Sequence, residues 1–317
     1  MKRWMILLAV LAIGLSALGF HVGRGNAAAV GSADGPQSPG VAPAYVRPLA
    51  LAAAKKAAPP AKAAEEKYWV EPMKKVHAKS TGDKGTFAHF GDSITVTMAF
   101  WCPLAWNRKN MDEPTQADFA LVKGYMKEAC WREWKGPAFG NEGSMTIRWA
   151  FDNVDAWLKK LNPETALIMF GTNDLGQLPL DEYETKVRAV IAKCFDNGTV
   201  VILSTIPPKH GQDAKAKTFV ESLRRIAREC GVPLCDYYEA VMSRRPDDWD
   251  GAMEKFKGAA GDVYQVPTLI SGDGVHPSNP KQWEGDYSED GLKHNGFVLR
   301  NYVVLRSYAD VIRSVLQ

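Results

Sequence analysis

A serine near the start of the predicted folded region stands where a nucleophile can be presented. It belongs to Gly91-Asp92-Ser93, which follows a short apolar run at residues 86–90 that is typical of a buried strand. A strand end fixes such a serine, a tight turn exposes its oxygen, and a neighbouring backbone N–H can face a developing oxyanion. Gly, Asp and Ser also form ordinary turns, so Ser93 needs partners elsewhere to count as a nucleophile.

A histidine and an aspartate lie close together far downstream. Asp273 precedes His276 by three positions in a loop punctuated by Gly and Pro. A histidine that acts as a base needs a carboxylate on one ring nitrogen so that the other is presented to the nucleophile. Taken singly, each residue is equally typical of a local hydrogen bond or a turn cap. With Ser93 they form a candidate set for acyl transfer.

The elements that must position these residues alternate between two patterns. Apolar runs predict strands at four places: residues 86–90, 165–170, 199–205 and 232–235. Helical spacing of apolar residues predicts five helices: residues 115–128, 146–161, 180–195, 213–230 and 296–316. This alternation indicates a parallel sheet covered by helices on both faces, a three-layer α/β/α fold. Sites in such folds form where strands end, and Ser93 and Asn173 both follow strand ends.

Three motifs occur in an order that resembles the SGNH hydrolases, also called the GDSL family of esterases and lipases. They are Gly91-Asp92-Ser93, Gly171-Thr172-Asn173-Asp174 and Asp273-Gly274-Val275-His276-Pro277-Ser278. Each motif is weak alone, but three in order are specific. The resemblance implies that residues 67–317 form an SGNH hydrolase domain. Its expected fold is a flavodoxin-like parallel sheet of five strands between helices.

The resemblance also implies roles for single residues. Ser93 would attack an ester carbonyl, His276 would take its proton, and Asp273 would orient the imidazole. The backbone N–H of Ser93 and the side-chain amide of Asn173 would stabilise the oxyanion. Water activated by His276 would then release the acid from the acyl-enzyme. The mechanism asks for no metal or other cofactor, so none is expected, and the partner is an ester substrate.

A glycine would supply a further oxyanion donor in this family. The best match lies in residues 139–146, just before a predicted helix, and Gly143 is nearest to the helix N-terminus. Ser144 stands where the family commonly has an Asp, which departs from the usual pattern. Gly140 remains an alternative donor, and either glycine could instead serve only a turn.

Insertions surround these motifs and bear on the substrate. Residues 101–134 contain four tryptophans that could stack on sugar rings or pack an inserted loop: Trp101, Trp106, Trp131 and Trp134. Residues 244–266 and 283–294 form two further insertions that could shape an acyl or alcohol pocket. His89 and His210 are more typical of core or loop histidines than of ligands.

The leading interpretation is an exported serine esterase that hydrolyses acetyl or other short acyl esters, with acylated carbohydrates as one candidate substrate. A lipase, a thioesterase or an O-acyltransferase would use the same residues, and a carbohydrate-binding module could retain the scaffold without catalysis. A metallophosphoesterase is disfavoured, because the six histidines include no His-x-His or Asp-x-His pair.

The N-terminal region differs in composition from the rest. Residues 1–29 predict a signal peptide, with Lys2 and Arg3 before an apolar run at 4–20 and small residues at 27–29. Cleavage would make the protein secreted or periplasmic, whereas an uncleaved run at 4–20 would anchor it in a membrane. Residues 30–66 are rich in Ala, Pro and Lys and predict a flexible linker.

Charge and cysteine content add two limits. The 317-residue chain has a formal charge of +3, which comes from the basic residues of the signal segment, so nucleic-acid binding gains no support. The five cysteines contain no C-x-x-C pair. Cys102 with Cys130, or Cys230 with Cys235, could form a disulfide in an oxidising compartment. Free buried thiols are the alternative.

Overall fold

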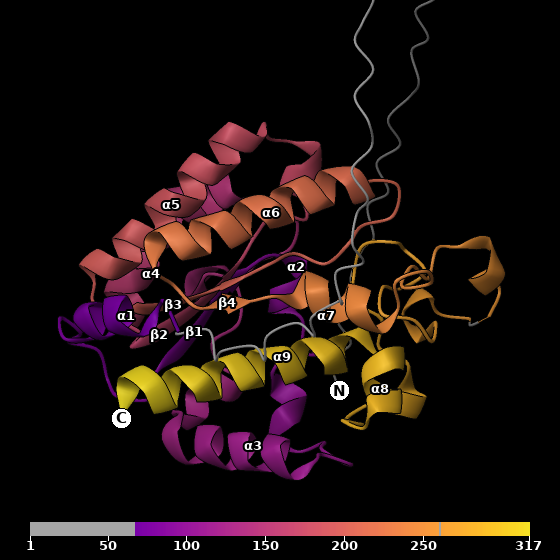
Figure 1. The fold of residues 1–317 in the computed structure, drawn as a ribbon, viewed down its shortest axis with the longest axis horizontal. Helices are drawn as coiled ribbons and strands as arrows, with labels where there is room; N and C mark the ends of the chain where they lie inside the picture. Colours follow the sequence, from indigo (N-terminus) through magenta and orange to yellow (C-terminus); the bar gives the residue numbers. More distant parts are fainter. Residues whose placement is uncertain (1–66, 260) are drawn as a thin grey trace, which may run out of the picture. The chain divides into compact units, whose positions relative to one another are not determined.

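The computed structural model describes residues 67–259 and 261–317, so the predicted signal peptide and linker lie outside the described residues. A parallel sheet forms the centre of the fold, with the strand order β1-β2-β3-β4 (Figure 1). The strands are β1 (Phe87–Gly91), β2 (Thr165–Met169), β3 (Val200–Ser204) and β4 (Leu234–Cys235). Every residue of β1, β2 and β3 is buried, as expected for a sheet covered on both faces.

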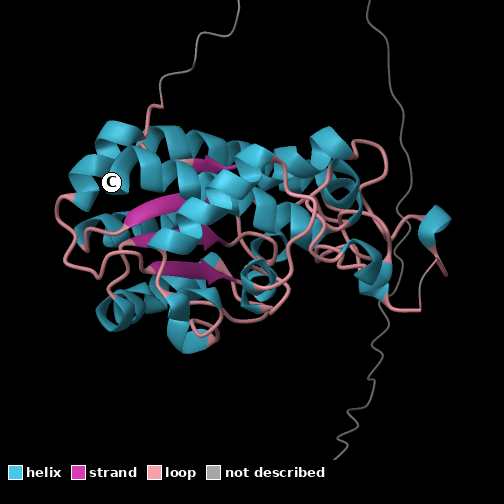
Figure 2. Cartoon of the chain, turned by 90° about the horizontal axis from the view of Figure 1, so that it is seen from below, coloured by secondary structure: helices cyan, strands magenta, loops and turns pink. Residues whose placement is uncertain are grey.

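Helices pack on the two faces of this sheet, and Figure 2 shows the strands enclosed between them. One group contains α4 (Ile147–Leu161), α5 (Leu180–Asp196) and α6 (Asp213–Cys230). In Figure 1, α5 and α6 lie above the strands, while α9 (Gly296–Val311) and α3 (Glu113–Tyr125) lie below them. The predicted three-layer α/β/α arrangement is therefore confirmed.

Shorter elements complete the described chain. The other α-helices are α1 (Val70–His77), α2 (Ser93–Val96), α7 (Tyr237–Arg244) and α8 (Glu289–His294). A π-helical turn, Ile312–Leu316, continues α9. Single 3₁₀ turns lie at Cys102–Ala105, Glu128–Trp131, Pro137–Phe139, Asp174–Gly176, Glu254–Phe256, Val263–Gln265 and Lys281–Trp283. Among these described elements, no helix is long and apolar enough to span a bilayer.

The expectation of five strands was wrong, since the described part of the chain forms four. At the edge of β1 that faces away from β2, Asn141 makes an isolated parallel bridge to Gly91. The chain reaches this point from the 3₁₀ turn Pro137–Phe139 through Gly140, which has a φ of +86°. This left-handed residue bends the backbone just before Asn141, so the preceding residues do not pair along β1 and a single bridge remains. A Cβ at position 140 would also lie 2.3 Å from the ring of Phe90.

The structure shows the state of the five cysteines and the packing of two tryptophans. All five cysteines are free thiols, so neither of the disulfide pairings considered is formed. Trp101 and Trp131 are buried and stack with ring centres 5.4 Å apart, which confirms core packing for these two. Trp106 is 57% exposed.

Candidate active site

Ser93 lies at the C-terminal edge of the sheet, two residues after the end of β1. Asp92 caps the short helix α2, and its Oδ1 accepts a hydrogen bond of 3.0 Å from the N–H of Ile94. Ser93 is thereby the first residue of that helix. Gly91 is required at the bend, because a Cβ there would lie 2.2 Å from the hydroxyl oxygen of Thr95.

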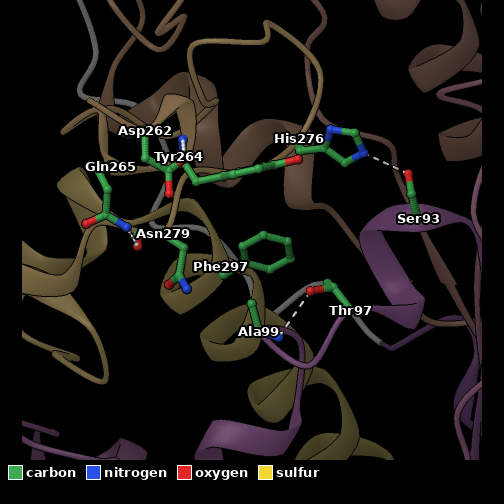
Figure 3. Close-up of a pocket in the computed structure, with 9 residues that line it drawn as sticks. All are labelled: Ser93, Thr97, Ala99, Asp262, Tyr264, Gln265, His276, Asn279 and Phe297. Atoms are coloured by element: carbon green, nitrogen blue, oxygen red, sulfur yellow. Dashed lines mark hydrogen bonds between the residues drawn. The ribbon is translucent and has the colours of Figure 1, made fainter. Parts of the chain in front are cut away.

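Ser93, His276 and Asp273 form one continuous hydrogen-bonded chain. The Oγ of Ser93 lies 2.8 Å from Nε2 of His276. Figure 3 marks this hydrogen bond with a dashed line. The Nδ1 of His276 lies 2.7 Å from Oδ2 of Asp273. Because the carboxylate accepts a hydrogen bond, it selects the tautomer with its proton on Nδ1, which leaves Nε2 free to accept the serine proton. The arrangement can therefore activate a serine as a nucleophile.

The carboxylate of Asp273 is held in its ionised form. Its Oδ1 accepts hydrogen bonds from Oγ of Ser271 at 2.7 Å and from the backbone N–H groups of Val275 at 2.8 Å and His276 at 2.9 Å. Burial opposes ionisation, but the hydrogen bond with the imidazole of His276, together with these three, outweighs it and holds the pKa of Asp273 well below its usual value. The hydrogen bond to Asp273 in turn raises the pKa of His276, against the opposing effect of burial.

Asn173 follows β2 and lies beside the nucleophile turn. Its Nδ2 donates to the carbonyl oxygen of Met145 at 3.0 Å and approaches Oδ2 of Asp92 at 3.4 Å. The second contact is long for a hydrogen bond and is therefore weak. One N–H of the Asn173 amide thus makes a firm hydrogen bond. The other can exchange its weak contact with Asp92 for a hydrogen bond to a stronger acceptor such as an oxyanion.

Gly143 lies in the turn before α4, and its N–H donates to Oε1 of Glu142 at 2.8 Å. The following residue, Ser144, has a φ of +62°, an unusual conformation for a residue other than glycine. The alternative donor is Gly140. Its N–H already donates to the carbonyl oxygen of Pro137, within its own turn, at 3.3 Å. The N–H of Gly143 is therefore bonded to a side chain, whereas the N–H of Gly140 is bonded to the backbone of its own turn.

Two buried carboxyl groups lie beneath these donors. Asp92 and Asp174 are both fully buried. Oδ1 of Asp174 accepts a hydrogen bond of 2.9 Å from the N–H of Ile147, the first residue of α4. Burial raises the pKa of Asp92 to about 6. Burial, reinforced by the charge of Asp92, raises the pKa of Asp174 to about 7. The sequence motifs contain both residues, but the fold brings their charges close enough to influence each other.

Two cations that the sequence analysis missed, the buried Arg300 and the partly buried Lys135, hold the segment after Ser93. Arg300 of α9 donates to the carbonyl of Ile94 and, at 2.9 Å, to the hydroxyl of Thr95. Lys135 donates to the carbonyls of Thr95 at 2.7 Å and Thr97 at 3.3 Å. Burial lowers the pKa of Arg300 to about 10 and that of Lys135 to about 8. An arginine within the largely apolar sequence of α9 indicates that its side chain is buried, but it does not identify the residues that the side chain contacts.

The remaining histidines of interest have structural partners. His89 is buried among the rings of Phe87, Phe100 and Trp101, as expected for a core histidine. Nδ1 of His210 lies 2.5 Å from Oδ2 of Asp250. In residues 67–259 and 261–317, no group of three or more His, Cys, Asp or Glu could hold a metal ion.

A cavity of about 390 Å³ opens beside Ser93 and His276. Its volume is at the lower end of the range of about 300–1,000 Å³ that is common for ligand pockets. Figure 3 shows the residues that line it: Ser93, Thr97, Ala99, Asp262, Tyr264, Gln265, His276, Asn279 and Phe297. None of the four tryptophans of residues 101–134 is among them.

Comparison with known proteins places this chain in a family. The model of the GDSL-like Lipase/Acylhydrolase family matches residues 89–280. The chain is similar to the esterase EstA from Pseudoalteromonas sp., at 16% identity and a TM-score of 0.44, covering 72% of this chain and 99% of EstA. It is also similar to a lipase/acylhydrolase from Enterococcus faecalis, at 16% identity and a TM-score of 0.45, covering 71% and 95%.

A third solved structure is that of a mutant of Axe2, an acetylxylan esterase from Geobacillus stearothermophilus. It is 15% identical, with a TM-score of 0.44, and the match covers 74% of this chain and 96% of that one. Comparison with curated proteins yields no match. The family model spans more than half of the chain, from the strand before Ser93 to beyond His276. The chain therefore belongs to the GDSL-like lipase/acylhydrolase family and is a carboxylic ester hydrolase.

Proposed function

We propose that the protein is an exported serine esterase in which Ser93 is the nucleophile, His276 the general base and Asp273 the residue that orients the imidazole. The observation that carries this proposal is the unbroken chain of short hydrogen bonds, 2.8 Å from Ser93 to His276 and 2.7 Å from His276 to Asp273. Export rests on the predicted signal peptide of residues 1–29.

The proposed reaction begins when Ser93 Oγ attacks the ester carbonyl carbon and its proton passes to Nε2 of His276. The carbonyl oxygen becomes an oxyanion that the N–H groups of Ser93 and Gly143 and the amide of Asn173 stabilise. His276 then gives its proton to the leaving alcohol, which departs and leaves an acyl-enzyme. Water, deprotonated by His276, attacks this ester and releases the acid and the free serine.

For the donors to act, two contacts must be exchanged. The N–H of Gly143 must leave the carboxylate of Glu142, and the amide of Asn173 must leave Asp92, whose contact is already long at 3.4 Å. A tetrahedral oxyanion is a stronger acceptor than a neutral carbonyl, so the exchange is favoured in the transition state. This difference is what lowers the barrier.

We further propose that the substrates are acetyl or other short acyl esters of carbohydrates. The modest cavity beside His276, with its mixture of aromatic and polar walls, supports this proposal. The test is turnover of p-nitrophenyl esters of increasing chain length alongside acetylated oligosaccharides. Maximal turnover at acetyl is expected, and an optimum at long acyl chains would instead indicate a lipase or thioesterase.

The role of Ser93 is tested with the same substrates. Ser93→Ala should lose turnover by a factor on the order of 10⁴ or more. Ser243→Ala, a change of a serine on α7, is the matched control and should retain full activity. Export is tested separately, by determining the N-terminus of protein recovered from the periplasm or medium. Residual turnover comparable to wild type in Ser93→Ala would contradict the proposed mechanism.

A further inference from the structure

The cavity lies on one side of the proposed catalytic residues. Ser93 and His276 line it, whereas the proposed oxyanion donors Gly143 and Asn173 do not. In the tetrahedral intermediate the carbonyl oxygen faces these donors, and the leaving oxygen must be within reach of the imidazole that protonates it. A cavity that adjoins the imidazole but neither Gly143 nor Asn173 is therefore placed to receive the leaving alcohol.

One wall of this cavity comes from the 244–266 insertion, and it is fastened to the loop that carries Asp273 and His276. The N–H of Gly272 donates to the carbonyl of Val263 at 2.8 Å, and the N–H of Asn279 donates to the carbonyl of Tyr264 at 2.7 Å. These bonds lie just before Asp273 and just after His276. The insertion is thus held in register with the catalytic loop.

This attachment places Tyr264 against the proposed base. The ring of Tyr264 lies with its centre 6.0 Å from that of His276, at an angle of 62° (Figure 3). Tyr264 is 37% exposed, so part of its surface is available to a ligand. Across the cavity, Phe297 and Ala99 provide apolar contact. An aromatic face opposite an apolar surface suits a saturated ring that presents C–H groups on its faces.

Polar groups at the end of the cavity suit hydroxyls. Asp262 uses Oδ1 to accept the N–H of Tyr264 at 2.9 Å, and its Oδ2 has no hydrogen-bond partner within the described residues. Asn279 uses Oδ1 to accept from Asn295 at 3.1 Å, while its Nδ2 donates to no group of the described chain. One acceptor and one donor thus remain for a ligand that carries several hydroxyl groups.

We propose that this cavity is the alcohol subsite, that its occupant is a hydroxyl-rich ring such as a single sugar unit, and that Tyr264 and Asp262 determine specificity for it. The inference rests on the proposed function, because it assumes that Ser93 and His276 carry out the reaction. Tyr264 stacks on the ring, and the Oδ2 atom of Asp262 accepts a hydrogen bond from a ring hydroxyl.

Two substrate series separate the alcohol side from the acyl side. The first varies the acyl chain on p-nitrophenol from acetyl to octanoyl. The second keeps the acetyl group and varies the alcohol among methyl acetate, cyclohexyl acetate and an O-acetylated methyl glycoside. The kcat/KM of each substrate is measured for wild type, Tyr264→Ala and Asp262→Asn. Trp106→Ala, which removes an exposed aromatic that does not line the cavity, is the control.

Tyr264→Ala should lower kcat/KM for both ring alcohols by roughly 3- to 10-fold relative to methyl acetate. Asp262→Asn keeps the acceptor for the Tyr264 N–H but loses the charge, so it should lower kcat/KM for the glycoside alone, by about 10-fold. The shape of the acyl-chain profile should not change in either variant. Trp106→Ala should resemble wild type throughout.

Three results would overturn the inference. A changed acyl-chain profile in Tyr264→Ala would show that the cavity takes the acyl group. An equal loss for every substrate, methyl acetate included, would show that Tyr264 supports His276 and does not select the alcohol. A wild-type protein that turns over no ester in either series would overturn the proposed function, and the inference with it.

Discussion

Arg300, within the last helix, donates hydrogen bonds to the carbonyl of Ile94 and the hydroxyl of Thr95, the two residues that follow Ser93. The guanidinium is fully buried and its centre lies 3.7 Å from the ring centre of Phe100. A buried cation that binds one backbone carbonyl and one hydroxyl of the short helix α2 fixes this helix and therefore the direction of the serine oxygen. Arg300 is a positioning residue in this arrangement.

Replacement of Arg300 should thus affect turnover more than binding. Arg300→Lys keeps the charge but cannot contact both oxygens with one planar fork. We expect kcat to fall by about 10-fold or more while KM changes little. Arg306→Lys, on the same helix but paired with Asp118 at 2.8 Å, is the control. An unchanged kcat in a folded Arg300→Lys protein would refute the positioning role.

The acid limb of activity should follow His276. Its hydrogen bond to Asp273 raises the pKa of His276 above the usual 6.5, so kcat/KM should rise with pH through a value above 6.5. Asp273→Asn removes both the charge and the correct tautomer, and should reduce kcat by about 10⁴. The residual activity should have its acid limb at a lower pH. A limb that does not move would mean that another group controls it.

Glu142 should restrain the oxyanion donor that it occupies. Its carboxylate accepts the N–H of Gly143 at 2.8 Å, and this bond must break before Gly143 can serve the substrate. Glu142→Gln weakens the contact because a neutral amide is a poorer acceptor than a carboxylate. We expect kcat/KM to rise by roughly 2- to 10-fold, measured with p-nitrophenyl acetate. A decrease would indicate that the contact holds Gly143 in its productive position.

Asp174 should make stability depend on pH. Burial raises the pKa of Asp174 to about 7 in the folded protein. The stability that the protonated side chain contributes is therefore fully present at pH values below the pKa of the unfolded state, and it is lost as the pH rises towards 7. Asp174→Asn keeps an acceptor for the N–H of Ile147 but cannot ionise. Between pH 4 and 7 the free energy of unfolding should therefore fall more in wild type than in the variant, by on the order of 2 kcal/mol. Urea unfolding at several pH values measures this, and parallel curves would contradict it.

Local signals were enough to predict the sheet and much of the proposed site. Apolar runs marked the four strands, and turn motifs at their ends marked Ser93 and Asn173. The predicted helix at 213–230 agrees with α6, Asp213–Cys230, because its apolar face and terminal Gly231 are encoded locally. The close approach of Ser93, His276 and Asp273 agrees with the expected arrangement.

Long-range contacts were not predictable in the same way. Arg300 and Ile94 are 206 positions apart, and nothing near either residue indicates that they meet. The fifth strand was expected from family resemblance, but a left-handed glycine at position 140 ends the pairing. The sequence left open whether the tryptophans stack on sugars or pack the core; Trp101 is fully buried, and the cavity is lined instead by Tyr264 and Phe297.

The bonds from the 262–265 turn to Gly272 and Asn279 couple the wall of the cavity to the loop that carries the base. Deleting or lengthening the insertion would displace the loop that carries His276 and so change turnover together with selectivity. Protein engineers who wish to change the range of alcohols accepted should therefore diversify the side chains of this turn while keeping its length constant.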